Sequence, residues 1–228
     1  MADFALIPAY NEAKNIKELI ARLRKNDDIK LIVVDDGSID RTREIVKRLG
    51  VTLLTLKTQR GKGQALKEGF SYILRKRPEA KFIVLIDADM QYLPEEAPRI
   101  LEPLKNGEAE LVTGYRKFSK IPYRHKMGNF VWRTLFNIMF DANFKDTNCG
   151  YMGMTRGAMK KMVGVMHGGY IIENAMFVQA IKNKMRIKQV PVSVVYHRKS
   201  KVARGIRVVA GVLIFILVEG FKYRLGIK

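Results

Sequence analysis

Cysteine is nearly absent from this sequence, which has Cys149 alone among 228 residues. One cysteine cannot form a disulfide bond within the chain, and such sparse use is typical of a reducing compartment. The three histidines are scattered, so no cysteine and histidine cluster has zinc spacing. These absences exclude a disulfide scaffold and a zinc finger.

A hydrophobic run long enough to cross a membrane is also missing. The charge-free run near the C-terminus, Val208 to Val218, has eleven residues. As a helix it would span roughly 16 Å, about half of the ~30 Å hydrocarbon layer. Met1 to Pro8 lacks the basic and apolar regions of a signal peptide, so we expect none.

Negative charge is in the minority. The chain has 42 Lys and Arg against 22 Asp and Glu, a formal net charge of +20. Such an excess predicts a polyanionic partner, which is a nucleic acid, an anionic membrane surface or a phosphorylated substrate.

Strands and helices are expected to alternate along the first half of the chain. This alternation predicts an α/β fold with a mostly parallel sheet and helices on both faces. By apolar periodicity, strands are expected at residues 4–7, 31–34, 51–56, 82–86 and 110–113, and helices near 16–23, 42–49, 64–75 and 95–105.

Polar clusters follow three of these strands: Tyr10 to Glu12, Asp35 with Asp36, and Asp87 to Gln91. In open α/β sheets, ligands bind beyond the carboxyl ends of the strands, so we expect one shared crevice. The turn Gly61 to Gly63 has neither Walker nor Rossmann spacing, and a tight turn alone would explain it.

The pair Asp87 and Asp89 follows the continuously apolar strand 82–86. Strand side chains alternate, so these two carboxylates are expected to project the same way. Hard oxygen ligands on one edge suit Mg²⁺ or Mn²⁺ that also holds a diphosphate. The alternative is a polar turn with solvated acids.

Eight short motifs follow one another in a fixed order over nearly the whole chain. They are PAYNE (8–12), VVDDGS (33–38), GKG (61–63), DADMQ (87–91), IPYRHKMGN (121–129), DTNCGY (146–151), YIIENAM (170–176) and HRKSK (197–201). The first four resemble family-2 inverting glycosyltransferases with the GT-A (Rossmann-like) fold. The last four resemble the dolichyl-phosphate or polyprenyl-phosphate mannose and hexose synthases.

The resemblance implies roles for individual residues. Asp89 and Gln91 would ligate the metal ion, with Asp89 also serving catalysis, and Arg116 would face the reacting phosphates. Two residues depart from the pattern: Met152 replaces a frequent Arg, and Ala175 replaces a frequent acid. The nucleotide's base and ribose would be held by Pro8, Tyr10, Glu12, Asp36 and Asp87.

A phosphate acceptor would need no general base, because a phosphate monoester is already largely dianionic at neutral pH. It would need cationic groups instead, and Glu173 would serve positioning. The candidate cations are Arg116, Arg124, Arg198 and Lys201.

Two apolar helices are expected in the C-terminal half, over Phe130 to Phe140 and over Val208 to Val218. Their basic flanks favour amphipathic helices at a membrane interface, and burial in the core is the alternative. We therefore expect a catalytic domain over 1–200, including an interfacial helix at 129–141, and a membrane-associating helix over 201–228.

The sequence predicts an inverting, metal-dependent transfer of a hexosyl group from GDP-mannose or a UDP-sugar to dolichyl or polyprenyl phosphate. It places the enzyme peripherally at the cytoplasmic face of a membrane. The alternatives are a glycosyltransferase with a soluble or protein acceptor and a basic nucleic-acid-binding protein. The acids expected in the crevice disfavour nucleic acid, because they would repel its phosphates.

Overall fold

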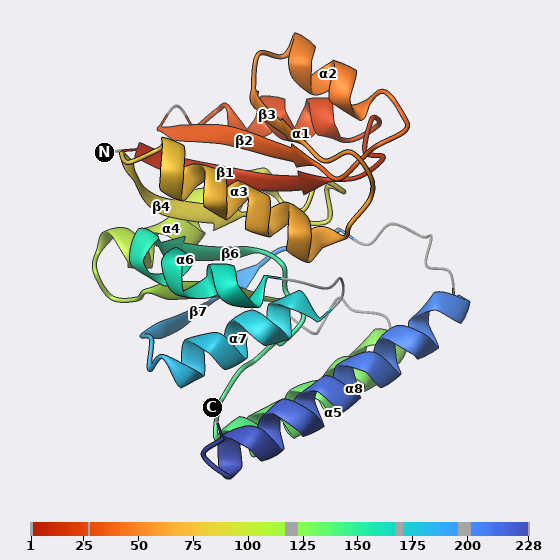
Figure 1. Cartoon of the computed structure of the whole chain (residues 1–228), viewed down its shortest axis with the longest axis vertical. Coiled ribbons are helices and arrows are strands. Elements are labelled where there is room, and N and C mark those ends of the chain that lie inside the picture. Colours follow the sequence, from red (N-terminus) through yellow and green to blue (C-terminus); the bar gives the residue numbers. More distant parts are fainter. Residues whose placement is uncertain (1, 27, 117–122, 167–170, 196–201, 228) are drawn as a thin grey trace.

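A computed structural model describes the chain except residues 1, 27, 117–122, 167–170, 196–201 and 228; of residues 123–129 and 202–209 it describes the backbone only. One seven-stranded sheet has the order β3-β2-β1-β4-β6-β5-β7 (Figure 1). Its strands are β1 (Ala2–Ala9), β2 (Ile29–Asp35), β3 (Thr52–Thr55), β4 (Ala80–Leu85), β5 (Leu111–Arg116), β6 (Met152–Thr155) and β7 (Ile187–Val192).

The described helices comprise eight α-helices and two short 3₁₀ helices, Pro94–Glu96 and Val163–Val165. The α-helices are α1 (Ile16–Leu23), α2 (Thr42–Arg48), α3 (Lys62–Lys76), α4 (Ala97–Lys105), α5 (Tyr123–Phe140), α6 (Arg156–Met162), α7 (Ile172–Lys182) and α8 (Val202–Arg224). All five strands expected from the sequence are present, and the sheet is mostly parallel, as predicted.

Two strands were not expected. β6 is a four-residue strand that lies between β4 and β5 and is antiparallel to both. β7 extends the sheet beyond β5, and its Lys188 and Gln189 interrupt the apolar pattern. Short or polar strands leave little periodicity in a sequence, which explains why the sequence does not predict β6 or β7.

The core has two layers, one on each face of the sheet. Alternate residues of β1 show the division, because Phe4 and Leu6 pack on the face covered by α3, α6 and α7. Ala5 and Ile7 pack on the opposite face, which is covered by α1, α2 and α4. Burial on both faces explains why the central strands are continuously apolar.

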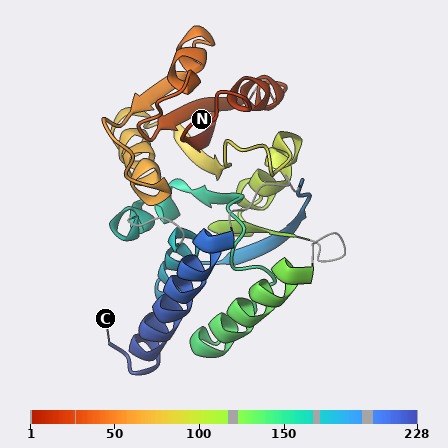
Figure 2. The same ribbon diagram turned by 90° about the vertical axis from the view of Figure 1, so that its right-hand side faces the viewer.

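Helices α5 and α8 lie side by side along one end of the molecule (Figures 1 and 2). The Tyr223 and Phe140 rings have centroids 5.5 Å apart, and the Arg224 guanidinium donates to the carbonyls of Ile138 and Met139. Lys182 on α7 pairs with Glu219 on α8 at 3.1 Å. No helix of the described residues is long and apolar enough to cross a membrane.

The contact between α5 and α8 depends on a glycine. A Cβ atom on Gly220 would lie 2.7 Å from Cβ of Met139, an atom fixed by the α5 backbone. We expect Gly220→Ala to lower the free energy of unfolding by about 1–3 kcal/mol through overpacking. Urea denaturation followed by circular dichroism measures this change.

The matched control is Gly211→Ala on the same helix, where a Cβ would meet nothing within 4 Å. Alanine there should leave stability unchanged or raise it by up to about 1 kcal/mol, the difference in helix propensity. Equal destabilisation by both substitutions would contradict tight packing at Gly220.

Candidate active site

A cavity of about 520 Å³ opens at the carboxyl ends of β1, β2 and β4. Pro8 and Tyr10 line it from the end of β1, Asp36 from the end of β2, and Asp87 with Asp89 from the end of β4. The predicted crevice therefore exists, and the cavity has the size of a small-molecule site.

Asp36 organises the entrance to α3. One carboxylate oxygen accepts from the N–H of Arg60 and the other from the N–H of Gly61, both at 2.8 Å. The Asp36 N–H donates to the carbonyl of Ala9 at 2.8 Å. This residue therefore fixes the loop that carries Lys62 into the cavity.

Asn11 joins the loops that follow β1 and β2. Its φ of 56° lies in the left-handed region, which asparagine tolerates better than most residues. Its N–H donates to Oγ of Ser38 at 2.9 Å, and its Oδ1 accepts from the N–H of Ile39 at 3.0 Å. The two loops thus form one wall of the site.

Lys62, the first residue of α3, bridges two carboxylates within the cavity. Its Nζ lies 2.6 Å from Oδ1 of Asp87 and 2.8 Å from Oε1 of Glu173. Burial alone would lower the pKa of Lys62, but the two negative charges outweigh burial and raise this pKa above its usual value. Lys62 is therefore a cation at neutral pH.

Negative charge accumulates around Glu12 in the same cavity. Burial raises the pKa of Glu12, and the charges of Asp89, Asp40 and Asp87 raise it further, against the lowering effect of a hydrogen bond from Asn15. The site therefore holds more negative charge than its own residues neutralise, which favours a bound cation.

The donor set fits a divalent ion held partly by substrate. Among the described residues, no three Asp, Glu, His or Cys side chains are grouped as a complete metal cage. Mg²⁺ is ordinarily bound by one or two carboxylates together with substrate phosphates. Asp87 and Asp89 line the cavity and match this pattern, whereas the lining does not include Gln91.

Arg116 lies in a different environment from the one expected. Its Nε and Nη2 donate to the two carboxylate oxygens of Asp146, at 2.6 Å and 2.9 Å. Asp146 is fully buried, and its Oδ1 also accepts from the N–H of Asn148 at 3.0 Å. This arrangement holds the 146–150 loop against β5, and the cavity lining does not include Arg116.

Not every candidate falls within the described part of the chain. Arg198 and Lys201 lie outside it, and Arg124 lies in the part of α5 whose side chains are not described. The cavity does bring together Pro8, Tyr10, Glu12, Asp36, Asp87 and Asp89.

Several lining residues were missed by sequence reasoning. For Lys62 the sequence indicates only a tight turn, although Gly61 and Gly63 beside it are a signal for a close backbone approach. Asn148, Trp132 of α5 and Val212 of α8 also line the cavity. Asn148 lies in the DTNCGY motif, which was a signal for it, whereas Trp132 and Val212 reach the site only through the tertiary fold.

The family model of glycosyl transferase family 2 matches residues 4–164. UDP-N-acetylglucosamine–dolichyl-phosphate N-acetylglucosaminyltransferase of Methanococcus voltae is 29% identical over 94% of this chain and 95% of its own length. Undecaprenyl-phosphate mannosyltransferase of Micrococcus luteus is 28% identical, with complete coverage of both chains.

Among solved structures, glucosyl-3-phosphoglycerate synthase of Mycobacterium tuberculosis is similar in fold. The TM-score is 0.78 at 20% identity, over 96% of this chain and 79% of that one. One structure of that protein contains Mn²⁺, uridine diphosphate and phosphoglyceric acid.

The ion pair of Lys62 requires a glycine at position 150. A Cβ there would lie 2.6 Å from Oδ2 of Asp87 and 2.7 Å from Nζ of Lys62. We expect Gly150→Ala to displace the carboxylate of Asp87, which the family resemblance assigns to the nucleotide, and so to weaken binding of a nucleoside diphosphate by about tenfold, the order of one lost charge-assisted hydrogen bond. Isothermal titration measures the affinity.

Gly157→Ala is the matched control, because a Cβ there would meet only Oγ1 of Thr155 at 3.8 Å. It should leave nucleotide affinity unchanged. If Gly150→Ala also bound nucleotide as the wild type does, the packing of residue 150 against the ion pair would have no part in the site.

Proposed function

The chain belongs to glycosyl transferase family 2 and has the GT-A fold, and we propose that it transfers a hexosyl group from a nucleotide-diphosphate sugar to dolichyl or polyprenyl phosphate. The observation that carries the proposal is the single cavity that gathers Glu12, Asp36, Asp87 and Asp89 at the carboxyl edge of the sheet. Relatives whose names include dolichyl and undecaprenyl phosphate support the acceptor class.

We assign the donor nucleotide to the half of the cavity formed by β1, β2 and β4. Pro8, Tyr10, Glu12, Asp36 and Asp87 would bind the base and ribose, and all five line the cavity. Asp89, with Gln91, would hold Mg²⁺ or Mn²⁺, which when bound would neutralise charge on the departing nucleoside diphosphate.

The acceptor phosphate requires cations more than it requires a base. Its second pKa lies near ~6, so the attacking oxygen already carries charge at neutral pH. We propose Arg124, Arg198 and Lys201 as the cationic groups that bind the acceptor phosphate. For Arg116, the bidentate contact with Asp146 favours a positioning role, in which it holds the loop that ends beside the cavity.

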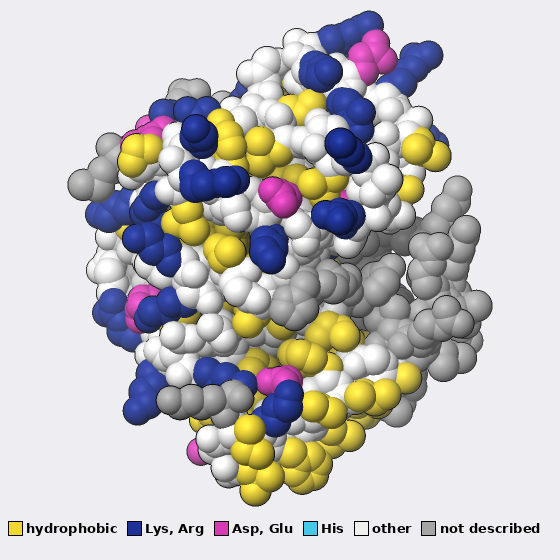
Figure 3. Space-filling model, in the orientation of Figure 1, with side chains coloured by type: hydrophobic (Ala, Val, Ile, Leu, Met, Phe, Trp, Pro, Cys, Tyr) yellow, Lys and Arg dark blue, Asp and Glu magenta, His cyan; other side chains and the backbone are white. Residues whose placement is uncertain are grey.

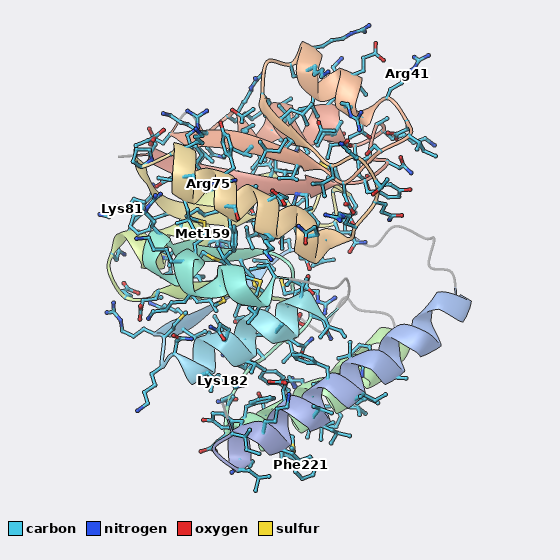
Figure 4. All side chains as sticks on the ribbon, viewed as in Figure 1. Arg41, Arg75, Lys81, Met159, Lys182 and Phe221 are labelled. Carbon is cyan, nitrogen blue, oxygen red and sulfur yellow. The ribbon has the colours of Figure 1, made fainter. Side chains whose placement is uncertain are left out.

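The membrane-facing surface is assigned to the outer faces of α5 and α8. Large apolar side chains gather at the lower edge of Figure 3, while Lys and Arg are spread over the upper part. Lys182 of α7 and Phe221 of α8 lie at the same lower end (Figure 4). The exposed large apolar residues among the described side chains of the pair are Phe130, Val131, Ile138, Ile214, Leu217, Val218 and Phe221, and Leu225 and Ile227 follow directly after α8.

The same two helices reach the cavity from inside, through Trp132 and Val212. An acceptor with a phosphate head and an apolar tail suits this arrangement, because a divalent ion held by the acids would attract the head and the apolar surface would bind the tail. We therefore propose residues 1–200 as the catalytic unit and 201–228 as a segment that binds the cytoplasmic face of a membrane.

Asp89→Asn tests the donor site. We expect removal of divalent ions by EDTA, or this substitution, to reduce transfer from UDP- or GDP-sugars to dolichyl phosphate by at least about 100-fold, because the diphosphate charge is then not neutralised. Product extracted into organic solvent measures transfer. Glu95→Asn, which removes an acid that pairs with Arg22 away from the cavity, is the control.

Full transfer by Asp89→Asn in EDTA would remove the metal ion from the mechanism. Labelled product that stays in the aqueous phase, obtained with phosphoglyceric acid as the acceptor, would instead favour a soluble acceptor.

Phe221→Ser with Leu225→Ser tests the membrane surface. These side chains are 60% and 72% exposed, so their loss should not disturb the core. Burying such a side chain contributes about 1.5–3 kcal/mol, so we expect at least about tenfold weaker binding to anionic vesicles. Sedimentation with vesicles measures binding.

The control is Ile39→Ser, since Ile39 is 88% exposed and lies between β2 and α2, far along the chain from both helices. It should bind vesicles as the wild type does. Wild-type protein that stays in the supernatant with vesicles present would show that α5 and α8 have no membrane role.

A further inference from the structure

Lys62 stands out in the charge balance of the cavity. Among the described residues that line the cavity it is the only Lys or Arg, whereas five acids line the same space. These acids are Glu12, Asp36, Asp87, Asp89 and Glu173. A diphosphate with two negative charges that bound in this cavity could therefore contact one ammonium group of the described lining, that of Lys62.

That ammonium group is already engaged. Asp87 and Glu173 each accept from it, at 2.6 Å and 2.8 Å, and the two acids come from opposite sides of the cavity, after β4 and at the start of α7. Gly150 packs so closely against the pair that a Cβ there would lie 2.7 Å from Nζ. The ammonium has three N–H bonds, and two are taken by carboxylates.

Asp36 limits how far Lys62 can move in response to a ligand. Its two hydrogen bonds to the N–H groups of Arg60 and Gly61 fix the backbone at the first turn of α3. The long side chain can therefore shift its ammonium between partners while its backbone stays in place.

We infer that Glu173 competes with the nucleoside diphosphate for Lys62, so that this carboxylate weakens retention of the nucleotide and promotes its release after transfer. The inference rests on the proposed function, because it takes a nucleotide-diphosphate sugar as the donor. It assigns Glu173 a role in nucleotide exchange, and Lys62 acts as the cation that two anions share.

The competition has a consequence that a purely structural ion pair lacks. Removing the charge of Glu173 makes one further N–H of Lys62 available to the diphosphate while Asp87 keeps its own contact, so nucleotide affinity rises although a contact in the empty site is lost. Turnover falls at the same time, because a more tightly held nucleotide leaves more slowly.

The experiment measures binding of UDP and GDP with Mg²⁺ by isothermal titration. Glu173→Gln should bind the preferred nucleotide about five- to tenfold more tightly than the wild type, the order of one charge-assisted hydrogen bond gained. Glu173→Asp keeps the net charge but shortens the side chain, so it should tighten binding in the same direction. Glu95→Gln removes a charge from a pair outside the cavity and should change nothing.

Lys62→Met completes a double-mutant cycle. In that background, Glu173→Gln should no longer tighten binding, because the shared cation is absent. Unchanged or weaker binding by both Glu173 variants would overturn the inference, as would tightening that persists without Lys62 or that Glu95→Gln reproduces.

A different binding result would contradict the proposed function itself. If the wild type binds neither UDP nor GDP with Mg²⁺ or Mn²⁺, the donor assignment is wrong and the inference fails with it. If the wild type binds one of them and only the Glu173 prediction fails, the donor assignment stands.

Discussion

Mutual repulsion among carboxylates at one edge of the sheet is the constraint on which this site depends. Parallel strands bring their carboxyl ends together, so acids that follow β1, β2 and β4 become neighbours in space. Burial is the main cause of the raised pKa of Glu12, and the charges of Asp89, Asp40 and Asp87 raise this pKa further. Asp36 relieves part of the repulsion by accepting from two backbone N–H groups, and Lys62 relieves another part by pairing with Asp87 and Glu173.

Much of the fold and of the donor side of the site could be predicted from the sequence. Apolar runs that end in polar clusters mark parallel strands and their carboxyl ends, so Glu12, Asp36, Asp87 and Asp89 could be assigned to one crevice before any coordinates. The signal is local, because each acid follows its own strand directly. The same apolar periodicity predicts the strand at 110–113 and the helix that precedes it, near 95–105.

The remainder depends on contacts between distant parts of the chain. Lys62 and Glu173 are 111 residues apart, and no local pattern joins them. Arg116 donates to Asp146, 30 residues further along the chain, through Nε and Nη2, and no local pattern joins these two residues either. Met152 follows the same logic: it departs from a polar family pattern because β6 places it, 1% exposed, within the core between β4 and β5.

The two apolar helices give the cavity a wall with two different environments. Trp132 and Val212 line the cavity, while Phe130 and Ile214 on the same helices are more than half exposed. Close packing at Gly220 and the contact from Arg224 to the end of α5 hold the helices together as one unit. The proposed membrane-facing surface and the cavity are thus lined by the same two helices. Under the proposed function, the apolar tail of the acceptor would bind the outer faces of these helices while its phosphate entered the cavity, and a soluble acceptor would need no such face.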